Sequence, residues 1–234
     1  MTLTSLLNKV NYFTAYHFNR LTQTIGKFKL TIHLYQNDIP AGLIFGKTIA
    51  IDTETQGLLL QRDRLCLIQL SDGNGDAHLV QFKADQYEAP NLKKLLSKPK
   101  TIKIFHFARF DIAAIEAYLG ITCSPVFCTR IASRLTRTYT EKHGLKDICA
   151  ELLDIEISKQ QQQSDWASTQ LTTEQQQYAA SDVLYLHQLM KILNTRLIRE
   201  SRMDIAQACF DFLPFQAKLD LEGWGNVDIF AHSS

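Results

Sequence analysis

The chain has 234 residues, of which 45% are hydrophobic and 21% are charged, and its formal net charge is +1. These values are typical of a soluble globular protein and exclude a strongly basic overall field, so a nucleic-acid partner would need a local basic patch. No apolar run approaches the length that crosses a membrane, and no membrane association is predicted.

Cysteine usage and the first residues bear on compartment and domain limits. The five cysteines form no Cys-x-x-Cys pair and their number is odd, which argues against a disulfide framework or a zinc site. We interpret them as small buried hydrophobic residues in a reducing cytosol, which predicts a cytoplasmic protein. The first 31 residues are basic and lack acids, which resembles a transit peptide in composition. We favour a plain N-terminal extension over residues 1–28, followed by one domain over 29–225 and a tail over 226–234.

The first part of the chain predicts strands. Apolar and alternating patterns mark strands at 29–35, 48–54, 65–70 and 77–82. The stretch 65–70 is nearly all apolar, which predicts a strand buried on both faces. Because the connections between the last three strands are short, an antiparallel arrangement is expected.

The rest of the chain predicts alternating helices and strands. Helices are expected at 91–97, 108–119, 145–153 and from a capping box at Thr172 to about residue 199, with strands at 102–105 and 126–128. The polar, basic stretch 129–143 predicts a loop, and a last helix over 203–221 is expected to be interrupted at Pro214. Antiparallel strands followed by alternating elements predict a mixed α/β sheet flanked by helices.

The first feature that carries chemistry is the end of the strand 48–54, where Asp52 and Glu54 follow an apolar run. Because side chains alternate along a strand, both carboxylates lie on one face. Two such charges repel and resist burial, so a divalent cation would stabilise the pair. Carboxylate oxygens are ligands for Mg²⁺ or Mn²⁺. By itself, the pair also fits a strand that ends in a polar turn.

The second feature is Asp111, which follows the strand 102–105 and lies near the start of the next helix. An aspartate there can simply complement the helix dipole. Asp111 nevertheless shares the spacing of a buried helix face with Ile115 and with Tyr118 or Leu119. A carboxylate on that face needs a partner.

The third feature is Tyr178 and Asp182, which lie four residues apart on one side of the long predicted helix. Alone, the pair also fits a hydrogen-bonded tyrosine and aspartate in a core. Taken together, the three segments favour a shared site, since each has a carboxylate where burial predicts an apolar residue. Four carboxylates would suit two divalent ions roughly 4 Å apart that clamp a phosphodiester. Tyr178 would orient the attacking water or help to deprotonate it.

Three motifs carry a resemblance to a known family: Asp52-x-Glu54, His106-x-x-x-x-Asp111 and Tyr178-x-x-x-Asp182. In this order and at these separations they resemble the motifs of DEDDy-type 3′-5′ exonucleases, in particular ribonuclease D in its short, single-domain bacterial form. The segments 64–70 and 164–166 support the resemblance, which covers about residues 32–194. One departure precedes the Ser-Asp-Trp element, where the family often has Lys-Ser and this chain has Lys159-Gln160.

The resemblance implies a ribonuclease H-like fold with a mixed five- or six-stranded sheet flanked by helices. It implies that residues 29–225 form an exonuclease domain that hydrolyses RNA from its 3′ end with two divalent metal ions, Mg²⁺ or Mn²⁺, and releases nucleoside monophosphates. The implied metal ligands are Asp52, Glu54, Asp111 and Asp182, and Tyr178 is implied to position the water. The implied substrate contacts are Thr55, which would meet the terminal sugar or backbone, Leu58, which would wedge against the base, and His106 and Phe107. His106 fits a packed histidine at a strand end equally well.

Several readings stay open at the level of sequence. The motifs barely separate RNA from single-stranded DNA, because RNA selectivity requires contacts to the 2′-hydroxyl. An inactive nucleic-acid-binding module and a metal-stabilised scaffold are the alternatives to an enzyme, and the oligomeric state is undetermined. Each basic residue of one set is a candidate for phosphate contacts but by itself also fits an ordinary solvated surface: Arg62, Arg64, Arg109, Arg130, Arg134, Arg137 and Lys142.

Overall fold

The computed structural model describes residues 31–158 and 160–232. The N-terminal extension predicted for residues 1–28 lies outside the described residues. Thr31 to Gln36 form the first described element, and the described residues from Ile32 onward form one compact unit. All that follows concerns this unit.

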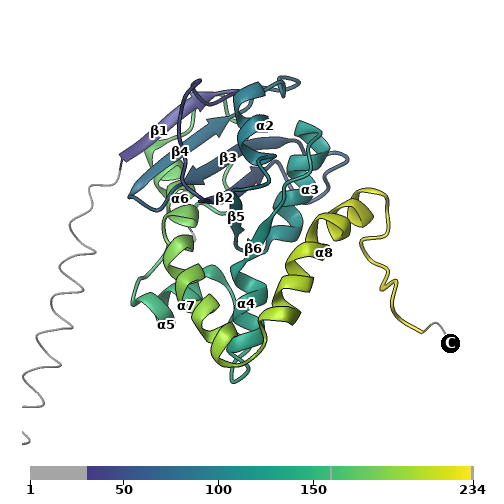
Figure 1. Cartoon of the computed structure of the whole chain (residues 1–234). Coiled ribbons are helices and arrows are strands. Elements are labelled where there is room, and N and C mark those ends of the chain that lie inside the picture. Colours follow the sequence, from purple (N-terminus) through teal and green to yellow (C-terminus); the bar gives the residue numbers. More distant parts are fainter. Residues whose placement is uncertain (1–30, 159, 233–234) are drawn as a thin grey trace, which may run out of the picture. The chain divides into compact units, whose positions relative to one another are not determined.

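A six-stranded mixed sheet forms the centre of the fold, as the sequence predicted (Figure 1). Its strands are β1 (Thr31–Gln36), β2 (Thr48–Thr55), β3 (Leu65–Ser71), β4 (Asp76–Gln81), β5 (Ile102–Phe105) and β6 (Val126–Cys128). Their order in the sheet is β1-β4-β3-β2-β5-β6. The pairs β2–β3 and β3–β4 are antiparallel, whereas β2–β5 and β5–β6 are parallel. The antiparallel arrangement expected for the strands at 48–54, 65–70 and 77–82 is therefore confirmed.

Helices flank the sheet and pack on one another beside it (Figure 1). They are α2 (Pro90–Leu96), α3 (Ala108–Leu119), α4 (Thr129–Thr136), α5 (Leu145–Leu153), α6 (Thr173–Leu184), α7 (Leu186–Arg199) and α8 (Met203–Leu221). Helix α6 packs on β2, β3 and β4, and α3 packs on β2, β3 and β5. Helix α8 packs on α3 and β6, while α4 and α5 pack on α7.

Strand β3 is buried along its whole length, because apolar groups cover both of its faces. Leu67 belongs to a small cluster with Trp166 and Ala179 of α6, whereas Ile68 and Leu70 belong to the main core. A strand buried on both faces explains the unbroken apolar run that the sequence shows. The neighbouring β2 therefore lies deep in the sheet, which places its polar end beside the core.

The long helix predicted from Thr172 to about residue 199 is two helices, and this prediction was wrong in one respect. The capping box at Thr172 is present, with Gln175 as its second member. The chain then changes direction at Tyr185, which separates α6 from α7. No proline or glycine causes this break. It coincides with a change of packing partners, because α6 packs on β2, β3 and β4, whereas α7 packs on β2, β5, α4 and α5.

Two other local predictions are also corrected. The stretch predicted as a loop over 129–143 begins with helix α4, whose Ala132 and Ser133 are buried. Helix α8 is continuous through Pro214, although proline removes a backbone donor. Burial of Phe210, Leu213 and Ala217 on one side of α8 stabilises the helix across that position.

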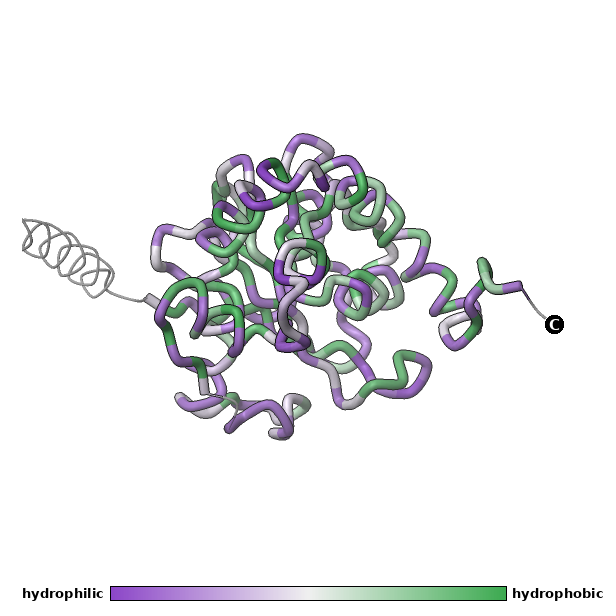
Figure 2. The backbone as a smooth tube through the Cα atoms, turned by 90° about the horizontal axis from the view of Figure 1, so that it is seen from below, coloured by the Kyte–Doolittle hydropathy of each residue, from purple (hydrophilic) through white to green (hydrophobic). Residues whose placement is uncertain are grey.

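The segment after α8 extends away from the rest of the unit and alternates between apolar and polar stretches (Figure 2). All five cysteines are free, and four of them are buried, as the sequence predicted for small hydrophobic residues. Among the described residues, no helix combines the length and the apolar character needed to cross a membrane.

Candidate active site

Three elements meet at a pocket of about 770 Å³ that contains the residues singled out by the motifs. Asp52 and Glu54 lie near the end of β2, and Asp111 lies in the first turn of α3, directly after β5. Tyr178 and Asp182 lie on α6, which crosses β2. Because β2 and β5 are parallel neighbours, the segments that follow them reach the same edge of the sheet.

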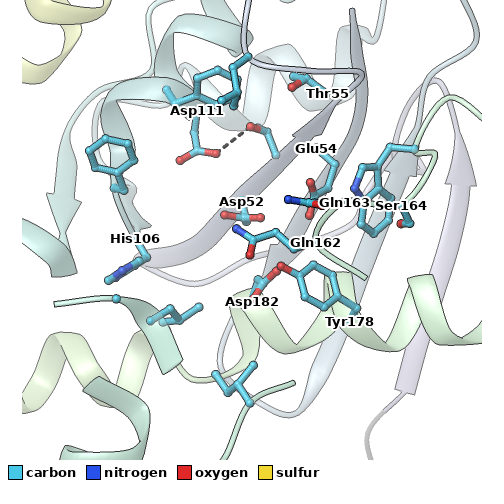
Figure 3. Close-up of a pocket in the computed structure, with 18 of the residues that line it drawn as sticks. Asp52, Glu54, Thr55, His106, Asp111, Gln162, Gln163, Ser164, Tyr178 and Asp182 are labelled. Atoms are coloured by element: carbon cyan, nitrogen blue, oxygen red, sulfur yellow. Dashed lines mark hydrogen bonds between the residues drawn. The ribbon is translucent and has the colours of Figure 1, made fainter. Parts of the chain in front are cut away.

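Three of the carboxylates form a tight group. One oxygen each from Asp52, Glu54 and Asp182 can be chosen so that all three lie within 4.8 Å of one another. Figure 3 shows these side chains pointing toward a common space, with Asp111 at its far side. Asp111 lines the same pocket but does not belong to this three-membered group.

Asp111 is held by a neighbour on the central strand. It is 5% exposed, and the Thr53 hydroxyl donates a hydrogen bond of 2.7 Å to its Oδ1 (Figure 3). Thr53 lies between Asp52 and Glu54 in sequence, so its side chain leaves the opposite face of β2, toward α3. One short strand segment thus supplies two carboxylates to one side and fixes a third from the other.

The carboxylates resist ionisation because they are buried close together. Burial, and then the charges of Asp182 and Asp111, raise the pKa of Glu54 to about 9. Burial raises the pKa of Asp111 to about 7. Burial and the Asp111 charge together raise the pKa of Asp182 to about 7 as well. The pKa of Asp52 lies well above its usual range for the same reasons. A cluster of this kind is fully ionised at neutral pH only when cations balance it.

The donor set fits hard divalent cations. All the ligand atoms are carboxylate oxygens, which suit Mg²⁺ and Mn²⁺, and no cysteine or histidine belongs to the group found among the described residues. The raised pKa values point the same way, because a bound cation would offset the burial and the repulsion that raise them. Asp52, Glu54 and Asp182 are therefore the candidates to hold an ion, and Asp111 lines the same pocket.

Tyr178 completes the acidic side of the pocket. Its phenol points toward the Asp182 carboxylate, and its ring packs against Trp166 with the ring centroids 5.9 Å apart (Figure 3). Burial and the charges of Asp182 and Glu54 raise the pKa of Tyr178 above its ordinary value. The phenol is therefore protonated at neutral pH and can donate a hydrogen bond.

Thr55, the last residue of β2, and Leu58, on the loop that follows it, lie on the rim of the pocket. Leu58 lines the pocket although it is 82% exposed, which is unusual for a leucine. The loop is closed by Asp63, whose Oδ2 accepts a hydrogen bond of 3.0 Å from the Leu59 amide. A side chain at Gly57 would bring its Cβ within 2.3 Å of the same Asp63 oxygen, so only glycine fits there. This packing presents Leu58 to the pocket.

His106 and Phe107 form another part of the rim, between β5 and α3. His106 Nδ1 lies 2.9 Å from the Thr129 hydroxyl, so the histidine both packs at the strand end and lines the pocket. Phe107 is 50% exposed and has a left-handed backbone with φ of 68°. A bulky residue in that conformation is strained, and such strain is typical of functional positions. Its exposed ring offers a face on which a base could stack.

Of the basic residues expected to contact phosphate, Arg130 lies at the pocket and its guanidinium sits 4.9 Å from the centroid of the Phe107 ring. Arg137 is fully buried and forms an ion pair with Glu151, so it cannot reach a substrate. The other candidates are absent from the described pocket lining: Arg62, Arg64, Arg109, Arg134 and Lys142. Of the seven, Arg130 alone lines the described pocket, and its contact with phosphate stays a prediction.

The sequence analysis missed several residues of the pocket. Lys146 of α5 lines it, as do Gln162 and Gln163 from the glutamine-rich turn. Trp166 lines it too, and its segment had served to support the family resemblance. The signal available for Gln162 and Gln163 was their position directly before the Ser-Asp-Trp element at 164–166.

The mixed sheet, with a carboxylate pocket where its parallel strands end, has the architecture of a ribonuclease H-like nuclease. A family model described as 3′-5′ exonuclease matches residues 37–198. The chain belongs to this family, and the predicted ribonuclease D-like resemblance and fold are confirmed.

Relatives and solved structures agree with this assignment. Ribonuclease D of Gluconacetobacter diazotrophicus is 31% identical over 67% of this chain, which spans 39% of that protein's length. The structure of Brucella melitensis NrnC bound to pGG is 54% identical, with a TM-score of 0.84 over 88% of this chain and 100% of that one. NrnC of the same organism with bound Mg²⁺ is 53% identical, with a TM-score of 0.83 over 87% of this chain and 100% of that one.

Proposed function

We propose that this protein is a two-metal-ion exoribonuclease that removes nucleotides from the 3′ end of RNA and releases nucleoside 5′-monophosphates. The observation that carries the proposal is the group of Asp52, Glu54 and Asp182 oxygens within 4.8 Å of one another, at the floor of a pocket shared with Asp111 and Tyr178. The similar NrnC structure that contains Mg²⁺ supports a divalent cation in this role.

The carboxylates would hold Mg²⁺ or Mn²⁺, which supply charge stabilisation for the phosphorane-like transition state and a more acidic water. Tyr178 donates its hydrogen bond to the attacking water and aligns it with the phosphorus. The water oxygen bonds to phosphorus while the bond to the 3′-oxygen breaks. That oxygen takes up a proton and becomes the new 3′-hydroxyl of the shortened chain.

The rim would place the 3′ end. Leu58 would wedge beside the terminal base, Phe107 would offer a stacking face, and Thr55 would meet the sugar or backbone. Arg130 and Lys146 would pair with phosphate oxygens farther from the carboxylates. His106 would support the same wall through its contact with Thr129.

Very short RNA belongs among the proposed substrates. Brucella melitensis NrnC, at 54% identity, has been solved with pGG. Because this chain shares the fold of that structure, with a TM-score of 0.84, we propose pGG as the first substrate to test beside longer oligonucleotides.

The test uses pGG together with matched 5′-labelled single-stranded RNA and DNA, each incubated with Mg²⁺, with Mn²⁺ or with EDTA. The expected result is stepwise loss from the 3′ end of RNA in either metal and none in EDTA. Faster shortening of DNA than of RNA would assign the activity to DNA. If neither substrate shortens although the protein binds Mg²⁺, the enzyme assignment fails and a binding or scaffold role replaces it.

A further inference from the structure

The glutamine turn, which we define as residues 160–163, lies beside the candidate active site but has no role in the proposed hydrolysis. The turn is closed by the Ser164 amide, which donates a hydrogen bond of 3.0 Å to the Gln161 carbonyl. Gln162 and Gln163 line the pocket, whereas Gln160 and Gln161 are not among the described residues that line it. Only part of the turn therefore lines the site.

The two inner glutamines point into the pocket beside the carboxylates of Asp52 and Glu54 (Figure 3). Gln162 and Gln163 are both exposed, and neither side chain makes a hydrogen bond to the protein within the described residues. An ordinary solvated run would project its side chains away from the fold. These two amides instead face the place where a phosphodiester would have to lie for hydrolysis.

The base of the turn is fastened to the helix that carries Tyr178 and Asp182. The Gln175 side chain donates hydrogen bonds of 3.1 Å to the Ser164 hydroxyl and 3.0 Å to the Asp165 carbonyl. Its Oε1 accepts from the Thr172 amide in the capping box, so Gln175 is itself fixed. The tip of the turn is thus held at a set place relative to the site.

An uncharged donor suits this place better than a cation. An amide offers two N–H donors to phosphate oxygens and one acceptor, without adding charge. A lysine here would pair with the carboxylates and compete with divalent cations for them. Arg130 and Lys146, the cations among the described pocket residues, lie on α4 and α5 instead. The pocket thus separates its neutral donors from its charged ones.

We propose that Gln162 and Gln163 are substrate-contacting residues, whose amides donate hydrogen bonds to the phosphodiester next to the carboxylates. The inference rests on the proposed nuclease function and adds the residues that hold the reacting phosphate. Gln175 acts as a positioning residue, because it fixes the base of the turn.

The test compares Gln162→Ala/Gln163→Ala with the matched control Gln160→Ala/Gln161→Ala from the same turn. For the inner pair, kcat/KM on single-stranded RNA is expected to fall about tenfold to 100-fold, which is the usual effect of losing hydrogen bonds to a charged group. The outer pair is expected to stay within about twofold. RNA affinity, measured by fluorescence anisotropy with Ca²⁺ in place of Mg²⁺, should fall for the inner pair alone.

Two further measurements separate a phosphate contact from a structural effect. Replacing one non-bridging oxygen of the scissile phosphate by sulfur should slow the wild type more than the inner pair, for one of the two stereoisomers. Gln162→Lys should raise the Mg²⁺ concentration needed for half-maximal rate, because the ammonium competes for the carboxylates. The melting temperatures of all variants should remain close to that of the wild type.

The outcomes distinguish this inference from the proposed function. If the wild type hydrolyses RNA but the inner and outer pairs behave alike in rate and affinity, the inference is overturned and the nuclease stands. The second outcome is that the wild type does not hydrolyse RNA, while RNA affinity falls in the inner-pair variant and not in the outer-pair variant. The contact then stands and the nuclease fails. Equal loss of rate and melting temperature in both pairs would assign the turn a structural role and refute the contact.

Discussion

At the scale of single residues, the partner of a charged group decides what it can do. Arg130 and Arg137 lie seven positions apart in one basic stretch. Arg130 faces the pocket, whereas Arg137 is fully buried, pairs with Glu151 and donates to the Lys142 carbonyl at 2.6 Å. The buried guanidinium of Arg137 holds the segment after α4 and is not available to contact a substrate.

Asp182→Asn is expected to lower turnover about 1,000-fold, or about 4 kcal/mol in the activation barrier, because Asp182 is proposed to hold a cation. The fold should be retained, and without metal the melting temperature should rise, since one repelling charge is gone. Rates, circular dichroism and melting in EDTA check this. Asp204→Asn, which changes an exposed aspartate outside the pocket lining, is the control and should keep full activity. Undiminished turnover in Asp182→Asn would refute the site assignment.

Tyr178→Phe is expected to slow hydrolysis about tenfold to 1,000-fold while Mg²⁺ affinity stays unchanged, since the phenol is proposed to orient the water and not to bind the cation. Calorimetric Mg²⁺ titration and single-turnover rates measure the two effects separately. The Trp166 contact should survive because the ring is kept. A parallel loss of Mg²⁺ affinity would show that the tyrosine has a different role.

At the scale of elements, α3 connects the site to the last helix. Arg109, two residues before Asp111, donates hydrogen bonds of 2.6 Å to each oxygen of Asp220 in α8 and one of 2.7 Å to the Gly225 carbonyl. Gln216 adds a hydrogen bond of 3.0 Å to the same carboxylate. These contacts fasten the end of α8, and the segment after it, to the helix that carries a candidate metal ligand.

Arg109→Ala and Asp220→Ala are each expected to lower the free energy of unfolding by about 1–3 kcal/mol, as for bidentate hydrogen bonds between charged groups. The double variant should cost less than the sum of the two, because both remove the same contact. Urea unfolding and hydrogen exchange over residues 203–225 provide the measurement. Arg199→Ala is a control, because that arginine is 70% exposed and should change stability by less than about 1 kcal/mol. Strict additivity would contradict the coupling.

At the scale of the whole molecule, the acidic pocket lowers the free energy of unfolding of the metal-free protein when its carboxylates ionise. The ordinary pKa values of aspartate and glutamate are 3.8 and 4.5, whereas those of Asp182 and Asp111 lie at about 7 and that of Glu54 at about 9. Over this interval the folded chain binds more protons than the unfolded chain. Stability from these groups is therefore complete at low pH and is lost as pH rises through 7 and 9.

The metal-free protein is therefore expected to lose on the order of a few kcal/mol of stability between about pH 5 and about pH 9. Mg²⁺ should restore stability at the upper end, since it binds the ionised carboxylates of the folded state. Thermal melting across this range, in EDTA and in Mg²⁺, checks both parts. The Asp182→Asn protein should show a shallower decline, and a melting temperature that rises with pH in EDTA would contradict the prediction.

The sequence by itself determined the fold class and the acidic side of the site. The apolar run over 65–70 predicts a doubly buried strand, and the order of the motifs predicts which carboxylates meet. Such features are encoded locally, because period-two and helical spacing fix which side of an element each residue takes. The strand 102–105 and the helices 108–119 and 145–153 were placed correctly for this reason.

Only the tertiary structure decided which polar residues face the pocket and where helices change direction. Arg109 pairs with Asp220, 111 positions later, and Gln175 fastens a turn that begins before its own helix. Helix α6 ends at Tyr185 because its neighbours differ from those of α7. These outcomes depend on contacts between segments far apart in the chain, and no local spacing contains that information.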